Sequence, residues 1–271
     1  MKGITWERFN LKRFFPFNLE KCYRCLTNKL ETPVRKHLTR VYTTLTFISL
    51  VAAAGGLAHE FNNTRLKAGI FTGICAIGSH VCLTKTPYEE SQKLYRKIQR
   101  LSLLGSFAFF TGFNLGPLLN LAVAVNPTIL LQALLGTTLV FACFSLSALY
   151  APRAHYLYLG SILLSILSTL TALSLMNIFL GSRLIFDMNL YVGLALCCGF
   201  IVYDTQIIME KARGGDRDYV MHSLELFLDF LGVFLRFFII LMEKEMEKKE
   251  RRKKKQPKMV TGKVKQSTSI F

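Results

Sequence analysis

Two aspartates lie in long apolar stretches of the chain. Asp204 ends the stretch LYVGLALCCGFIVYD, and Asp229 lies inside VMHSLELFLDFLGVFLRFFIILM. An ionised acid at bilayer depth costs at least about 2.5–3.5 kcal/mol, so a membrane protein retains one only where it is used or neutralised. Two carboxyl groups that meet in a low-dielectric site titrate together and share a proton. The pair therefore predicts a proton sensor or an ion site.

The segment around Asp229 carries further polar residues at helical spacing. His222, Glu225, Asp229 and Arg236 follow at i, i+3, i+7 and i+14, which places them on one side of a helix. Intramembrane polar groups face the interior of a bundle, so this helix is predicted to be central, with the other helices around it. Glu225 would add negative charge, either for cation capture or to cap the polar channel. His222 would tune the site at about pH 6–7 or lie at the interface. Arg236 is expected to extend towards the interface at the C-terminal tail, with a counter-ion role as the alternative.

The elements that must position the two aspartates are the last two apolar segments. They are joined by the short polar connection at residues 210–219, so they can lie antiparallel with both acids at a similar depth. In the first of them Gly193, Cys197 and Asp204 form one stripe, and its two small residues leave a groove for another helix. The alternative makes Asp204 a helix-end residue at the headgroup level and Asp229 a partner of Arg236, about 10.5 Å further along the axis.

The apolar residues of the chain come in blocks that fit membrane spans. Of the 271 residues 51% are apolar, and runs of about 18 or more apolar residues with few charges predict transmembrane helices. We expect an all-α membrane protein, a seven-helix bundle with the C-terminal helix at its centre. The first six spans are expected at 41–58, 68–83, 101–121, 128–150, 154–180 and 184–204, and the more polar seventh segment at 220–242.

The positive charge of the chain is concentrated in particular segments. The net charge is +17; residues 1–40 hold ten Lys or Arg and residues 243–271 hold eleven, whereas the connection 122–127 holds none. This is positive-inside asymmetry rather than a nucleic-acid-binding face. We therefore predict a basic cytosolic N-terminal arm at 1–40, a helical membrane domain at 41–242 and a basic tail at 243–271. A cytosolic tail requires a re-entrant seventh segment, whereas a seventh crossing puts the tail on the opposite side.

Long stretches of the chain resemble a known family. LYVGLALCCGFIVYDTQIIMEKARGGDRDYVMHSLELFLDF and NLGPLLNLAVAVNPTILLQALLGTTLVFACFSLSALYA are similar to the Bax inhibitor family, the transmembrane Bax-inhibitor-motif proteins, and to its animal branch in particular. The resemblance runs from about Val34 to Lys255. It implies a seven-helix bundle in the endoplasmic reticulum membrane, a pH-sensitive calcium leak and suppression of cell death. It also maps the family's di-aspartyl sensor onto Asp204 and Asp229.

The resemblance implies one further site, in which the chain departs from the family. Some members are thought to pair the acid site with a basic residue of the second helix. The apolar part of that helix offers only His80 here, with Arg65, Lys67 and Lys85 at its ends. His80 is therefore the supporting residue that this helix can contribute, in place of a salt bridge.

Three classes of function were weighed against these features. The first is a proton-gated calcium pore, in which Asp204 and Asp229 bind calcium transiently, calcium is the transported ion and no cofactor is needed. The second is a non-conducting membrane interaction protein that regulates cell-death or stress machinery through its basic tails. The third, an intramembrane aspartyl protease, is disfavoured because the Gly-x-Gly-Asp run of such enzymes is missing around Asp229. We therefore expect no enzyme, and the expected partners are the lipid bilayer, calcium, protons and cell-death regulatory membrane proteins.

Overall fold

The computed structural model describes residues 31–61, 69–88, 94–151 and 158–255, and these contain helices and no strand. The all-α fold predicted from the sequence is confirmed. Most of the predicted arm and the last residues of the tail lie outside the described residues. The helices within these ranges are α3 (Thr32–Phe61), α4 (Ile70–Lys85), α5 (Leu94–Val125), α6 (Thr128–Tyr150), α7 (Leu159–Leu180), α8 (Arg183–Arg213) and α9 (Tyr219–Lys255).

Five of the described helices are long and apolar enough to cross a membrane, namely α3, α5, α6, α7 and α8. The apolar helix α4 has only 16 residues, and α9 combines an apolar half with a strongly charged end. Large apolar side chains point outwards from the bundle, among them Phe179 with 91% and Ile70 with 85% of their surface exposed. Such side chains are stable against lipid, so the outer surface is consistent with a membrane environment.

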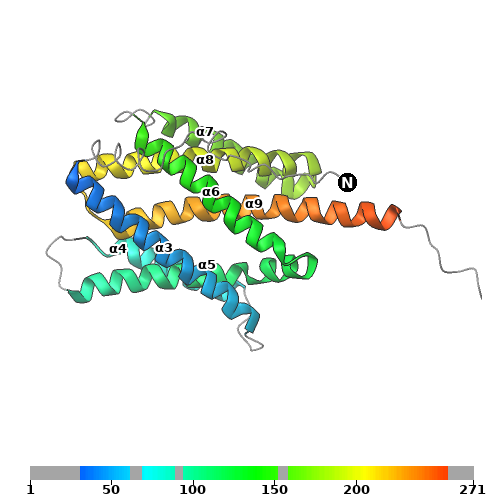
Figure 1. Cartoon of the computed structure of the whole chain (residues 1–271), viewed down its shortest axis with the longest axis horizontal. Helices are drawn as coiled ribbons and strands as arrows, with labels where there is room; N and C mark the ends of the chain where they lie inside the picture. Colours follow the sequence, from blue (N-terminus) through cyan, green and yellow to red (C-terminus); the bar gives the residue numbers. More distant parts are fainter. Residues whose placement is uncertain (1–30, 62–68, 89–93, 152–157, 256–271) are drawn as a thin grey trace, which may run out of the picture.

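The C-terminal helix α9 runs through the middle of the bundle (Figure 1). It packs against α8, α3, α6 and α5, whereas α4 packs chiefly on α5 and α7 on α8. Leu226, Phe227 and Phe238 of α9 are almost completely buried. The central position that the polar stripe predicts is therefore confirmed, and α4 and α7 form an outer layer.

Helices α3 and α5 approach each other backbone to backbone. A Cβ atom added at Gly55 of α3 would collide with the carbonyl oxygen of Phe109, and one added at Gly112 of α5 would collide with the carbonyl oxygen of Ala52. Small residues permit such contacts in membranes, where lipid gives helices no hydrophobic reason to associate and close packing must replace it. The glycines therefore hold α3 and α5 together as one unit.

The two ends of α9 lie at opposite ends of the bundle. Just before α9, Asp218 contacts Arg100 near the start of α5, while Lys249 donates to the carbonyl of Val125 at the end of α5. Because α9 is a single continuous helix between these points, the seventh segment runs the full length of the bundle and is not re-entrant. Helix α3 continues across the predicted domain limit at residue 40, and α9 across that at residue 242. The two limits stay predictions of where the chain enters and leaves the membrane.

Candidate proton and cation site

A tight turn sets the register between α8 and α9. Gly215 adopts φ 94°, a left-handed conformation that glycine enters at little cost. The N–H of Asp216 donates to the carbonyl of Lys211 at 3.0 Å, and the N–H of Asp218 donates to Oδ1 of Asp216 at 3.1 Å. The two helices therefore run antiparallel and in contact, as the short connection predicts.

The antiparallel register brings Asp204 and Asp229 together. Their carboxyl groups lie in hydrogen-bonding contact, and both residues are half-buried. A carboxylate only accepts hydrogen bonds, so this contact requires a proton on one of the two groups. Oδ2 of Asp229 is buried and has no hydrogen-bond partner among the residues that the structure describes. We call these two residues the carboxyl pair.

The alternative reading of the two aspartates is wrong. Helix α8 continues beyond Asp204 to Arg213, so Asp204 is not at a helix end. Arg236 does not pair with Asp229: its Nη1 lies 3.1 Å from Sγ of Cys197 and donates to the carbonyl of Gly232 at 3.3 Å. No ion pair joins Arg236 to a carboxylate in the part of the chain that the structure describes.

The expected extension of Arg236 towards the interface is also wrong. Its guanidinium lies against Gly193, where an added Cβ would collide with Nε. Gly193 and Cys197 form the groove on α8 that the sequence predicts, and the arginine side chain fills it. A long side chain extends to the interface when no nearer space accepts it, and this groove supplies the nearer space.

Glu225 lies one turn before Asp229 and pairs with a residue that the sequence reasoning missed. Nζ of Lys211 lies 3.0 Å from Oε1 of Glu225, with 39% of the lysine side chain and 29% of the glutamate side chain exposed. The signal was present in the sequence, because pairing Asp204 with Asp229 places the end of α8 beside the first turns of α9. The charge of Glu225 is thus partly balanced on the side away from the carboxyl pair.

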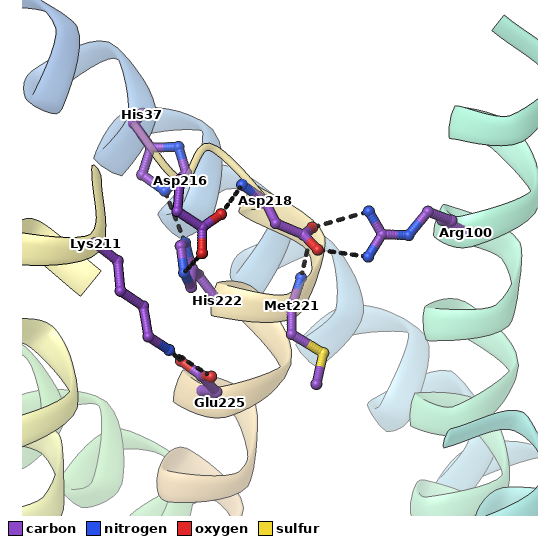
Figure 2. A network of polar contacts seen from close by, with 8 residues as sticks. All are labelled: His37, Arg100, Lys211, Asp216, Asp218, Met221, His222 and Glu225. Carbon is purple, nitrogen blue, oxygen red and sulfur yellow. Dashed lines mark hydrogen bonds and ion pairs between the residues drawn. The ribbon is translucent and has the colours of Figure 1, made fainter. Parts of the chain in front are cut away.

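His222 lies in a separate group of polar residues, which Figure 2 shows. It is 1% exposed, its Nδ1 lies 2.9 Å from Nε2 of His37, and its Nε2 lies 3.8 Å from Oδ2 of Asp216. His222 precedes Asp229 by seven residues, about 10.5 Å along the helix. It is therefore a buried residue at the end of the bundle, beside the turn, and not a neighbour of the carboxyl pair.

The same group contains a buried ion pair. Nη1 and Nη2 of Arg100 donate to the two carboxylate oxygens of Asp218 at 3.0 and 2.6 Å (Figure 2). Oδ1 of Asp218 also accepts from the N–H of Met221 in the first turn of α9, at 3.2 Å. We call His37, Arg100, Asp216, Asp218 and His222 the polar cluster. It ties α3, α5 and the turn to the start of α9.

His80 is not joined to the carboxyl pair by a polar contact. Its ring lies 5.7 Å from that of Phe107 of α5, and Phe107 lies 6.2 Å from the ring of Phe227 of α9. Two aromatic layers thus connect α4 to the central helix. His80 packs in this arrangement as a flat, largely apolar side chain.

The donor atoms near the carboxyl pair suit weak cation binding. Within the described residues no group of three or more His, Cys, Asp or Glu could hold a metal ion. Calcium takes about six to eight oxygen ligands, so two carboxyl groups supply a small part of its shell and water must supply most of the rest. Two carboxyl groups alone would therefore hold a cation only weakly.

Comparison with known proteins places the chain in a family. Residues 34–246 match the family model described as inhibitor of apoptosis-promoting Bax1. Bax inhibitor 1 of Homo sapiens is 46% identical over 216 residues, 79% of this chain and 88% of the relative. That of Rattus norvegicus is 45% identical over the same shares, and that of Arabidopsis thaliana is 43% identical over 245 residues, 90% of each chain. This chain, a helical membrane bundle with its carboxyl pair between α8 and α9, belongs to the Bax inhibitor family.

Proposed function

We propose that the protein is a pH-sensitive calcium leak channel of the endoplasmic reticulum membrane that suppresses apoptosis. The carboxyl pair, Asp204 and Asp229, is its proton sensor and transient cation ligand. The observation that carries the proposal is the contact between two carboxyl side chains inside a membrane bundle. The relatives named Bax inhibitor 1 support the role in apoptosis. In this proposal the basic N-terminal arm is on the cytosolic side, because positive charge is concentrated in it.

The charge of the carboxyl pair sets the state of the channel. With one shared proton the pair carries one negative charge. The proton bonds the two carboxyl groups to each other, and the charge attracts calcium. A second proton removes the charge, and loss of the shared proton makes the two groups repel. Because the pair lies at the contact of α8 with α9, each change of charge alters the packing of these helices.

Glu225 prepares the entry of the cation. It is closer than the carboxyl pair to the turn at 214–218, and part of its side chain is exposed. A hydrated calcium ion that approaches from that end meets Glu225 first and the pair one helical turn later. Weak oxygen ligands in succession allow an ion to enter and to leave, which conduction requires.

The test is calcium flux through the purified protein in liposomes as a function of pH. Asp204→Asn and Asp229→Asn remove the shared proton, so each is expected to flatten the pH dependence of the flux. Asp187→Asn is the matched control, because Asp187 lies on the same helix, pairs with Arg183 and is 41% exposed. A pH dependence that persists unchanged in both pair variants contradicts the sensor role.

A second function is supported by the end of α9. The helix carries Lys244, Lys248, Arg251 and Arg252 beyond the apolar core, on an exposed surface. This end would serve a non-conducting protein that acts on cell-death machinery through its tails. The test replaces Lys248, Arg251 and Arg252 by Gln and leaves Glu243 and Lys249, which contact the bundle. Loss of protection from cell death with normal calcium flux favours the interaction role.

A further inference from the structure

Three hydroxyl groups from three helices converge in the interior of the bundle. Tyr42 belongs to α3, Ser145 to α6 and Thr205 to α8. Ser145 is 4% and Thr205 0% exposed, and the hydroxyl oxygens of all three are buried without a well-formed hydrogen bond to the described residues. The Tyr42 hydroxyl faces both of the others. The three oxygens thus share one polar site.

Other hydroxyl groups of α3 and α6 form hydrogen bonds within their own helix. Thr43, Ser49 and Thr138 donate to the carbonyl four residues before them in their own helix. This bond is open to any serine or threonine in a helix and needs no tertiary partner. Ser145 and Thr205 do not use it, although each is deeply buried. Their oxygens are therefore directed at something other than their own backbone.

The free-energy cost of burying these hydroxyl groups points to water as their ligand. A buried hydroxyl without a partner costs about 1–3 kcal/mol. Ser145 and Thr205 relieve this cost for Tyr42 only in part, because the three groups face one another but none of these contacts has full hydrogen-bond geometry. Buried water relieves it, because one water molecule accepts and donates about two to four hydrogen bonds. Calcium is the poorer match, since it prefers carboxylate and carbonyl oxygens and this site offers three neutral hydroxyl groups.

We propose that Tyr42, Ser145 and Thr205 form a water-binding site inside the bundle, and that this water is the hydrated step of the path to Asp204. Thr205 follows Asp204 directly in α8, so the water lies next to the carboxyl pair along this helix. It lies on the face of α8 that is turned to α3 and α6. The second half of the proposal rests on the proposed channel function; the first half does not.

Radiolytic hydroxyl-radical footprinting of the purified protein tests the water site itself. Radicals formed from a bound water modify the side chain beside it, so Tyr42 is expected to react promptly although its hydroxyl is buried. Tyr95, 75% exposed, is the reference for accessible tyrosine, and Phe227, 1% exposed, is the reference for a dry aromatic ring. Reaction of Tyr42 at the level of Phe227 overturns the water site.

Variants locate the water at the three hydroxyl groups. Thr205→Val combined with Ser145→Ala is expected to lower the reaction of Tyr42 to the level of Phe227, whereas Thr205→Ser keeps it. Thr137→Val is the matched control, because the hydroxyl of Thr137 is also buried and has no hydrogen-bond partner among the described residues. Thr137 precedes Ser145 by eight residues, about 12 Å along α6. An unchanged reaction of Tyr42 in the double variant overturns the assignment.

Calcium flux then tests the place of the water on the path. Thr205→Val is expected to slow the flux at every pH and to leave the midpoint of its pH dependence in place, since the carboxyl pair is intact. Footprinting that detects the water together with wild-type flux in Thr205→Val overturns its role in conduction. If the wild-type protein shows no flux, the proposed function fails while footprinting still decides the water site.

Discussion

The polar cluster and the carboxyl pair lie on the same central helix and differ in how their charges are matched. In the cluster, Arg100 meets Asp218 through two hydrogen bonds, and the ring nitrogens of His222 face His37 and Asp216. In the pair, two like groups face each other, and the neighbouring Arg236 bonds to Cys197 instead. Opposite charges in contact favour one arrangement, whereas like charges that share a proton change their interaction with pH.

The polar cluster at the start of α9 and the carboxyl pair further along therefore have separate roles. The cluster anchors the start of α9 to α3 and α5, and the pair lies about 10.5 Å further along. Because the start of α9 is held firmly, a change of charge at the carboxyl pair is expected to move the C-terminal end of α9 and not the polar cluster. We therefore expect substitutions in the cluster to affect stability and substitutions around the pair to affect the response to pH.

The largest effect is expected from Arg100→Ala. Arg100 and Asp218 have 4% and 14% of their side chains exposed, and loss of one partner of a buried pair leaves the other charge uncompensated, at a cost of about 3–5 kcal/mol. Thermal unfolding of the detergent-solubilised protein measures the loss. The double variant Arg100→Ala with Asp218→Ala should recover part of it, since no lone charge then remains.

Arg183→Ala is the control for Arg100→Ala. Arg183 also forms an ion pair with a distant residue, Glu243, but 67% of its side chain is exposed. Exposed pairs contribute at most about 1 kcal/mol. Equal destabilisation by the two arginine variants would show that the cluster does not anchor the bundle more firmly than a surface pair does.

A smaller effect is expected from Gly112→Ala in the helix pair that supports the cluster. The new Cβ would meet the backbone carbonyl of Ala52, which cannot move without separating α3 from α5. Overpacking of this kind costs about 1–3 kcal/mol. Gly105→Ala on the same helix meets no atom within 4 Å and should instead stabilise the protein by about 0.5–1 kcal/mol. The same sign for both variants, measured by thermal unfolding, would contradict the close contact of α3 with α5.

The sequence carried enough information for the helices and for the meeting of Asp204 with Asp229. Long apolar runs determine the spans, and a short turn between two of them determines their register. The polar cluster was not predictable in this way, because 185 residues separate His37 from His222 and 118 separate Arg100 from Asp218. Only the packing of α3 and α5 around α9 brings these residues together.

Arg236 shows a second limit of sequence reasoning. The preference of a long cationic side chain for the interface is a local rule, and it assumes that the bundle offers no space. Gly193 and Cys197 provided that space, and both were recognised as a groove in the sequence. The missing step was to match the groove with the residue that fills it, which requires the register between α8 and α9 at the level of single turns.

The smallest effect is expected from variants of Lys211 and Glu225, the charged residues near the carboxyl pair. Lys211→Met leaves Glu225 without its 3.0 Å partner, so its negative charge acts more strongly on the pair, which then keeps its proton to higher pH. Glu225→Gln removes that negative charge and moves the midpoint of the calcium flux to lower pH. Each shift should stay within about one pH unit, because a partly exposed charge pair contributes at most about 1 kcal/mol. Shifts in the same direction in liposome flux assays would mean that Glu225 acts on the channel by a route other than its charge.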